Sequence, residues 1–153
     1  MKPLSICAVL LAASSLLSCS KDKKDDPTPP TKTELLSNKD WVTSAVVATY
    51  NGTPIDVYNN TAFFPACQKD NILRFSPDKT YNVSEGAVSC APPSTETGAW
   101  ALSTDETKLT RTPPSGSATT ADILELTDTS LKVSQAGNYQ GIPVTVTFTF
   151  QKK

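Results

Sequence analysis

The chain has 153 residues, with 14 Lys and Arg against 15 Asp and Glu, for a formal net charge of −1. Because the charge is nearly balanced and no basic patch is interleaved with aromatic residues, the composition argues against a nucleic-acid partner. The sequence contains no histidine, which excludes Ser-His and Cys-His catalytic pairs. We therefore expect a protein that is not an enzyme, with no catalytic residues, no metal site and no cofactor.

The N-terminus carries the features of an export signal. Residues 6–17 are mostly apolar but shorter than the roughly 20 residues of a membrane-spanning helix. The stretch ends in Leu16-Leu17-Ser18-Cys19, which resembles the lipobox of bacterial lipoproteins. An ordinary secreted protein is the alternative, but it would not need the cysteine. We expect cleavage of residues 1–18, a lipid on Cys19, and a location at the outer membrane of a Gram-negative bacterium, facing the periplasm or the surface.

A charged, proline-rich segment follows the predicted cleavage site. Residues 19–33 are too polar to bury and too rich in proline to form a helix, so we expect them to be a tether. One domain of ordinary size then covers residues 34–153. Thr31 or Thr33 could cap a single helical turn ahead of the first strand. We expect this turn to plug one end of the core.

From Trp41 onward, β-branched and aromatic residues occur in short alternating runs separated by turn clusters. In the last run, Val144, Val146, Phe148 and Phe150 share one face, so that one face of the strand is buried. The eight runs that we predict as strands are 41–50, 71–75, 80–84, 97–102, 108–112, 120–126, 131–134 and 143–150.

Eight consecutive strands linked mostly by short turns predict an all-β fold. An eight-stranded up-and-down antiparallel barrel with a short N-terminal helical turn fits best, because closing the sheet removes its exposed edges. A β-sandwich is the alternative. A sandwich usually needs long crossover connections, and the only long ones here are 51–70 and 85–96.

Two cysteines remain in the domain once Cys7 leaves with the signal and Cys19 carries a lipid. Since export brings them to an oxidising compartment, we expect Cys67 and Cys90 to form a disulfide. A metal-binding or nucleophilic pair is the alternative, and it would lack a histidine partner.

Several motifs together resemble the lipocalin-like domain of small bacterial lipoproteins, over residues 34–152. They are Cys67-Gln-Lys-Asp70-Asn-Ile-Leu-Arg-Phe75, Asp78-Lys-Thr-Tyr81, Cys90, Gly98-Ala-Trp100-Ala-Leu102, Ile123-Leu-Glu-Leu126 and the last strand. The resemblance implies a lipocalin-like barrel and a cysteine pair placed like Cys67 and Cys90. For most members of this family it implies no established biochemical activity.

An eight-stranded barrel is either filled by its own side chains or holds one small ligand. The side chains that we expect to point inward include several large rings, which favours a mostly filled interior over a ligand-binding cup. They are Trp41, Phe75, Tyr81, Val83, Trp100, Leu102, Leu109, Val133, Val144, Val146 and Phe148. The connection 51–70 is also unusually apolar, and would serve as a plug over the barrel end or as a lid or recognition surface.

The function that we expect is that of a lipid-anchored, monomeric, non-enzymatic envelope protein whose barrel binds a small apolar or amphipathic ligand. The alternative is a structural or interaction module with a filled barrel, which engages another envelope protein or a glycan. The candidate ligand contacts are Trp41, Tyr58, Phe63, Phe64, Phe75, Tyr81, Trp100 and Phe148.

Overall fold

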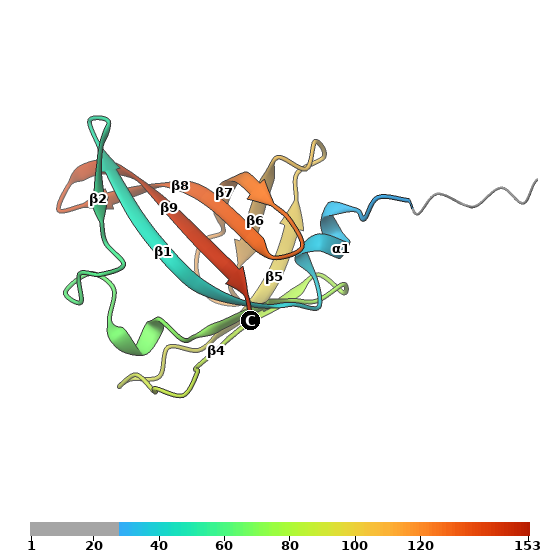
Figure 1. Ribbon diagram of the computed structural model, residues 1–153, viewed down its shortest axis with the longest axis horizontal. Helices are drawn as coiled ribbons and strands as arrows, with labels where there is room; N and C mark the ends of the chain where they lie inside the picture. Colours follow the sequence, from blue (N-terminus) through green and yellow to red (C-terminus); the bar gives the residue numbers. More distant parts are fainter. Residues whose placement is uncertain (1–27) are drawn as a thin grey trace, which may run out of the picture.

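The computed structural model describes residues 28–153, which form a closed β-barrel with one short α-helix (Figure 1). The predicted signal peptide, Cys19 and most of the predicted tether lie outside the described residues. The elements are α1 (Lys32–Leu36), β1 (Asp40–Tyr50), β2 (Thr53–Asp56), the 3₁₀ turn η1 (Ala66–Gln68), β3 (Ile72–Phe75), β4 (Thr80–Ser84), β5 (Glu96–Leu102), β6 (Lys108–Thr112), β7 (Thr119–Leu126), β8 (Ser130–Tyr139) and β9 (Ile142–Lys152).

All strand pairings are antiparallel, and consecutive strands pair from β3 to β9. The barrel closes where β9 pairs with β1. Two strands pair with the other edge of β1. Residues 40–42 pair with β3, and residues 47–50 pair with β2. The predicted eight-stranded barrel is thus confirmed over the sandwich, and β2 is a short additional strand.

The structure corrects two of the expected connections. The first lies within 51–70, where Thr53–Asp56 folds back on β1 as a strand. The second lies between the predicted strands 131–134 and 143–150, where residues up to Tyr139 continue β8 opposite β9. The chain turns instead at Gln140 and Gly141, whose φ angles of 51° and 84° suit a two-residue hairpin turn.

The helical turn closes one end of the barrel, as expected. Of the two candidate caps, Thr31 is the one used, and it forms a capping box with Glu34. The helix carries Leu36 into the core, where its side chain is fully buried. The indole Nε1 of Trp41 donates a hydrogen bond of 2.9 Å to the carbonyl oxygen of Leu36, which ties the helix to the start of β1.

Aromatic side chains fill the barrel next to α1. The rings of Phe75 and Trp100 meet edge to face, with centroids 5.6 Å apart, and Trp100 Nε1 donates to the carbonyl oxygen of Ser76 at 2.9 Å. Gly98 lies directly opposite Tyr81, and a Cβ there would stand 2.7 Å from the Tyr81 ring. Glycine at this position therefore makes room for the buried tyrosine.

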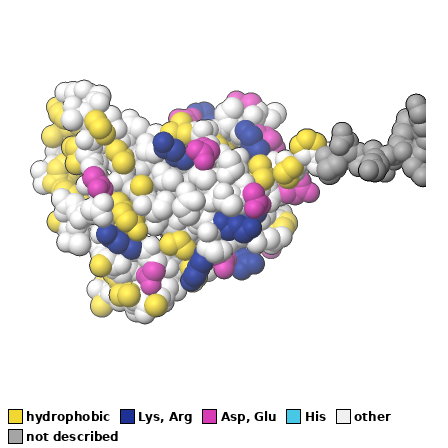
Figure 2. Space-filling model, in the orientation of Figure 1, with side chains coloured by type: hydrophobic (Ala, Val, Ile, Leu, Met, Phe, Trp, Pro, Cys, Tyr) yellow, Lys and Arg dark blue, Asp and Glu magenta, His cyan; other side chains and the backbone are white. Residues whose placement is uncertain are grey.

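The two ends of the barrel differ in character. The α1 end also contains the first described residues, whereas the tips of the β1–β2 and β8–β9 hairpins lie at the opposite end (Figure 1). Apolar side chains gather at this opposite end in the space-filling view (Figure 2), and its exposed large ones are Tyr50, Ile55, Phe63, Tyr139 and Ile142. Within residues 28–153, no helix is long and apolar enough to cross a membrane.

Candidate functional site

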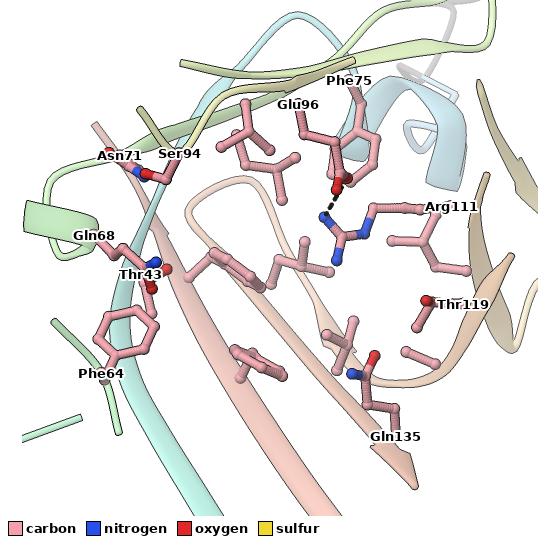
Figure 3. A pocket seen from close by; sticks show the side chains of 18 of the residues that line it. Thr43, Phe64, Gln68, Asn71, Phe75, Ser94, Glu96, Arg111, Thr119 and Gln135 are labelled. Atoms are coloured by element: carbon pink, nitrogen blue, oxygen red, sulfur yellow. Dashed lines mark hydrogen bonds and ion pairs between the residues drawn. The ribbon is translucent and has the colours of Figure 1, made fainter. Parts of the chain in front are cut away.

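A cavity of about 370 Å³ opens into the barrel at the end opposite α1 (Figure 3). This volume lies at the small end of the range of ligand pockets, which is roughly 300–1,000 Å³. The expectation of a mostly filled interior therefore holds only for the α1 end. Towards the mouth, short side chains such as Thr43, Thr119 and Ala121 take the inward positions, and they leave the space unfilled.

The deeper wall of the cavity is mainly apolar. Phe148 and Phe150 on β9 line it with nearly parallel rings, whose centroids are 6.2 Å apart. They lie on the face of the last strand that the alternation predicted to be buried. Leu109, Leu131 and Val133 add aliphatic surface from β6 and β8. Such a wall favours ligands with an apolar part.

Three polar side chains are linked at the boundary between the packed end and the cavity. The hydroxyl of Tyr81 donates a hydrogen bond to Glu96 Oε1, and Arg111 Nη1 lies 3.9 Å from the same oxygen. The Arg111 guanidinium also lies near the ring of Tyr81, with its Cζ 5.5 Å from the ring centroid. Burial, reinforced by the bond to Glu96, raises the pKa of Tyr81 to about 12, so its hydroxyl stays a donor.

A second polar pair lines the cavity beside the disulfide loops. Asn71 Nδ2 donates to Ser94 Oγ at 2.8 Å. The oxygen of the same amide group, Asn71 Oδ1, is buried and accepts no hydrogen bond from any described residue. A buried acceptor without a hydrogen bond destabilises the fold. A donor on a ligand, or a water molecule, would therefore bind favourably to this atom.

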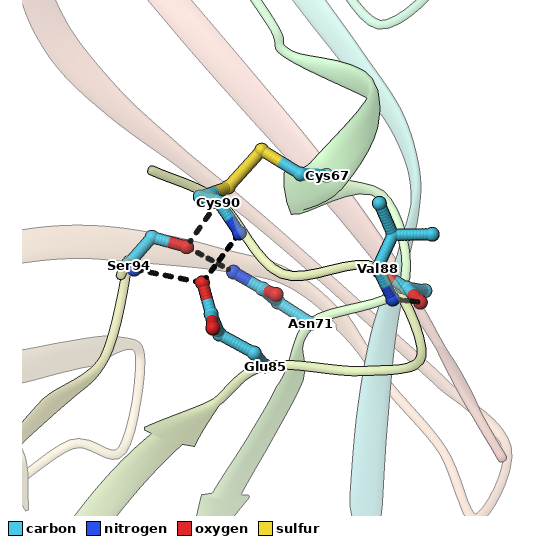
Figure 4. Close-up of a disulfide and its surroundings, with 7 residues drawn as sticks. Cys67, Asn71, Glu85, Val88, Cys90 and Ser94 are labelled. Carbon is cyan, nitrogen blue, oxygen red and sulfur yellow. Dashed lines mark hydrogen bonds between the residues drawn. A yellow bond between two sulfur atoms is a disulfide. The ribbon is translucent and has the colours of Figure 1, made fainter. Parts of the chain in front are cut away.

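The predicted disulfide between Cys67 and Cys90 is present, with a Cα–Cα distance of 5.2 Å. It joins η1 to the β4–β5 connection (Figure 4).

Glu85 orders the β4–β5 connection. Its Oε1 accepts hydrogen bonds from the backbone N–H groups of Cys90 at 2.8 Å and Ser94 at 3.0 Å. The bond from Ser94, followed by that from Cys90, lowers the pKa of Glu85. The disulfide and these hydrogen bonds therefore fix the position of the β4–β5 connection relative to η1 at the cavity mouth.

The predicted ligand contacts separate into three groups. Phe64, Phe75 and Phe148 line the cavity. Trp41, Tyr81 and Trp100 belong to the packed core, where each is at most 2% exposed. The remaining two, Tyr58 and Phe63, lie in the 57–71 connection outside the cavity.

That connection flanks the mouth and does not seal it. Phe64 faces the cavity, and its ring lies 5.5 Å from that of Tyr58, which in turn lies under the ammonium group of Lys69 at 4.3 Å. Phe63 is exposed and meets Tyr139 of the β8–β9 hairpin edge to face, with centroids 5.2 Å apart. The segment thus contributes one lining side chain and one exposed aromatic contact at the rim.

The sequence reasoning missed the polar lining, above all Glu96 and Arg111. A signal for Arg111 was present, because it lies two residues after the inward-facing Leu109 and so falls on the same face of its strand. The inward side chains expected from the sequence are all aliphatic or aromatic, so Arg111 is not among them. Among residues 28–153, His, Cys, Asp and Glu side chains form no group of three that could hold a metal ion.

Comparison with solved structures gives distant similarities. A bovine odorant binding protein in complex with a selenium-containing odorant is 15% identical, with a TM-score of 0.47, and the match covers 85% of this chain and 77% of that one. A deswapped triple mutant of bovine odorant binding protein is 16% identical, with a TM-score of 0.44 and coverages of 78% and 74%. Lobster apocrustacyanin A1 is 12% identical, with a TM-score of 0.42 and coverages of 78% and 61%.

Comparison with protein families is more direct, although no curated protein matches the sequence. Residues 38–133 match the lipocalin-like domain family. The matched segment starts just before β1 and extends into β8, so it contains most of the strands that enclose the cavity. Because this segment is more than half of the chain, the protein belongs to the lipocalin-like domain family.

Proposed function

We propose that this protein binds a small amphipathic ligand in the barrel cavity and catalyses no reaction. The observation that carries the proposal is the open cavity of about 370 Å³, whose apolar wall is interrupted by a few polar groups. That combination is typical of small-molecule sites, and eight-stranded barrels of the lipocalin type have room for one such ligand.

We further propose that the binding protein is held at the bacterial outer membrane by a lipid on Cys19. The lipobox-like sequence supports this, and so does the direction of the chain. The described residues begin beside α1, at the closed end of the barrel. A tether attached there would leave the cavity mouth directed away from the lipid.

A second candidate function is docking to another envelope protein or a glycan through the rim. The exposed pair of Phe63 and Tyr139 favours it, because exposed aromatic side chains are common at recognition surfaces. Ligand binding remains the leading candidate, since a docking module needs no cavity.

Binding of the neutral fluorophore N-phenylnaphthylamine tests the leading proposal. We would use the full chain with Cys19→Ala, so that no lipid competes for the probe. Thr119 lines the cavity, whereas the adjacent Thr120 pairs with Thr110 on the outer face of the barrel. Thr119→Trp should weaken probe binding at least about tenfold by filling the cavity, and Thr120→Trp should leave it unchanged.

Two results would contradict cavity binding. One is the absence of any saturable probe signal from the unsubstituted barrel. The other is an equal effect of the two tryptophan substitutions, which would place the probe on the outside of the protein. Circular dichroism of both variants would verify that each has folded.

A further inference from the structure

We propose that the ligand is a small monocarboxylate with an apolar chain, and that Arg111 binds its carboxylate inside the barrel. This inference rests on the proposed function and names the chemical class of its ligand. It arises from one charged side chain in a mainly apolar cavity, and from the groups that surround it.

Arg111 lies on the inner face of β6, directly opposite Trp100 of β5, and its guanidinium points into the cavity (Figure 3). Its side chain is 34% exposed, so a ligand that covered it would remove most of its remaining water. A guanidinium carries five N–H donors in a planar fork that matches a carboxylate. Within residues 28–153, no side-chain hydrogen bond engages this guanidinium, and its carboxylate neighbour is 3.9 Å away. The fork is therefore free to bind a ligand.

One of the two carboxylate oxygens of Glu96 is already engaged. Its Oε1 already accepts the hydroxyl proton of Tyr81, and a tyrosine that stays protonated keeps that bond. A ligand ammonium seeking Glu96 would also approach the positive charge of Arg111. The two side chains thus favour a head group that accepts hydrogen bonds over one that donates them.

The local charge also limits how negative the head group should be. Glu96 and Arg111 together are neutral before a ligand arrives. One carboxylate would gain charge-assisted bonds to Arg111 and leave a single net negative charge, whereas a phosphate dianion would face stronger repulsion from Glu96. A monocarboxylate therefore fits better than a phosphate.

The cavity wall determines the chemical character and the length of the ligand's remaining part. Phe148, Phe150, Leu131 and Val133 form a continuous apolar surface on the neighbouring strands β8 and β9. An alkyl or aryl chain covers such a surface without leaving polar atoms unpaired. The volume of about 370 Å³ limits this chain to a short one.

The test compares decanoate, decanol and decylamine as competitors of N-phenylnaphthylamine, using the full chain with Cys19→Ala. We expect decanoate to bind about ten to a hundred times more tightly than decanol. Arg111→Met should abolish this preference while decanol still binds, and Arg111→Gln provides a second variant if the first does not fold. The matched control is Arg74→Met, because Arg74 pairs with Asp40 on the outer face and should leave the preference intact.

Other outcomes would overturn the inference. They are equal binding of decanoate and decanol to the unsubstituted barrel, a decanoate preference that survives in both Arg111 variants, or a preference for decylamine that Glu96→Gln removes. Each of these leaves the proposed binding function standing, because the fluorophore is still displaced from the cavity. If the fluorophore itself does not bind, the proposed function fails as well.

Discussion

Tyr81 links the packed end of the barrel to its cavity. Its ring packs near Phe75, with centroids 6.4 Å apart, and is only 2% exposed, while its hydroxyl reaches Glu96. The same side chain thus contributes to the core and holds a charged group at the edge of the cavity. Arg111 completes the arrangement, because its guanidinium lies near the ring of Tyr81.

The raised pKa of Tyr81 predicts a pH dependence of stability. Since the folded pKa of about 12 exceeds the ordinary tyrosine pKa of 10.0, the stabilisation is complete below pH 10 and is lost as the pH rises towards 12. A shift of this size corresponds to a stabilisation of about 3 kcal/mol. Tyrosinate absorbance should show a late ionisation near pH 12 that Tyr81→Phe removes. If the late ionisation persists in this variant, it belongs to another of the four tyrosines, and the prediction is wrong.

At the scale of elements, the cavity mouth depends on two connections that have no regular strand partner. The 57–71 connection contributes Phe64 and Gln68 to the lining, and the β4–β5 connection contributes Ser94 and Thr95. The disulfide joins the two. Gly86 brings them close, because a Cβ on this residue would lie 2.3 Å from the carbonyl oxygen of Asp70.

Removal of the disulfide should therefore affect both stability and binding. The two cysteines lie 23 positions apart in the sequence. Closing a loop of this size corresponds to about 3 kcal/mol of stabilisation in the chain-entropy model. We expect Cys67→Ser with Cys90→Ser to lower the free energy of unfolding by about this amount and to weaken ligand binding, as measured by urea unfolding and fluorophore titration.

Reduction of the unsubstituted protein provides the control for that prediction. A reductant should reproduce the loss in stability, and should change nothing further in the double variant. Unchanged affinity in the double variant would mean that strand side chains alone hold the ligand, and that the two connections do not shape the mouth.

At the scale of the whole molecule, the barrel is polarised along its axis. One end is packed with aromatic side chains and capped by α1, whereas the other contains the cavity and the exposed apolar rim. The described chain enters at the capped end (Figure 1). This arrangement agrees with the proposed function, in which a tether at the closed end would leave the cavity mouth facing away from the membrane.

The proposed lipid anchor at Cys19 predicts how the full protein distributes in cells. Cys19→Ala should move the protein from the membrane fraction to the soluble fraction, because acyl chains supply the membrane affinity. Cys7→Ala is the matched control, since Cys7 belongs to the predicted signal and should not affect anchoring. Fractionation followed by immunoblotting measures both. Membrane association that survives Cys19→Ala would contradict lipid anchoring.

The strands were predictable because their pattern is local. Alternation identifies the inward face of β9, on which Phe148 and Phe150 line the cavity, and the same periodicity would have identified Arg111 as inward-facing. β2 was not predictable in this way. Its four residues, from Thr53 to Asp56, are all exposed, so they carry no alternation of buried and exposed positions. Their strand conformation depends on pairing with the end of β1.

The sequence alone predicts the all-β class, the number of barrel strands and the pairing of Cys67 with Cys90, and it leaves Thr31 and Thr33 as alternative helix caps. These depend on short-range patterns and on the small number of cysteines. The fold was needed to show that Thr31 is the cap used, that the barrel is filled at one end and hollow at the other, and that Tyr81, Glu96 and Arg111 meet between the two. The reason is that β1 must pair with β9 before side chains from distant strands share one interior, and the sizes of these side chains at each level then decide where space remains.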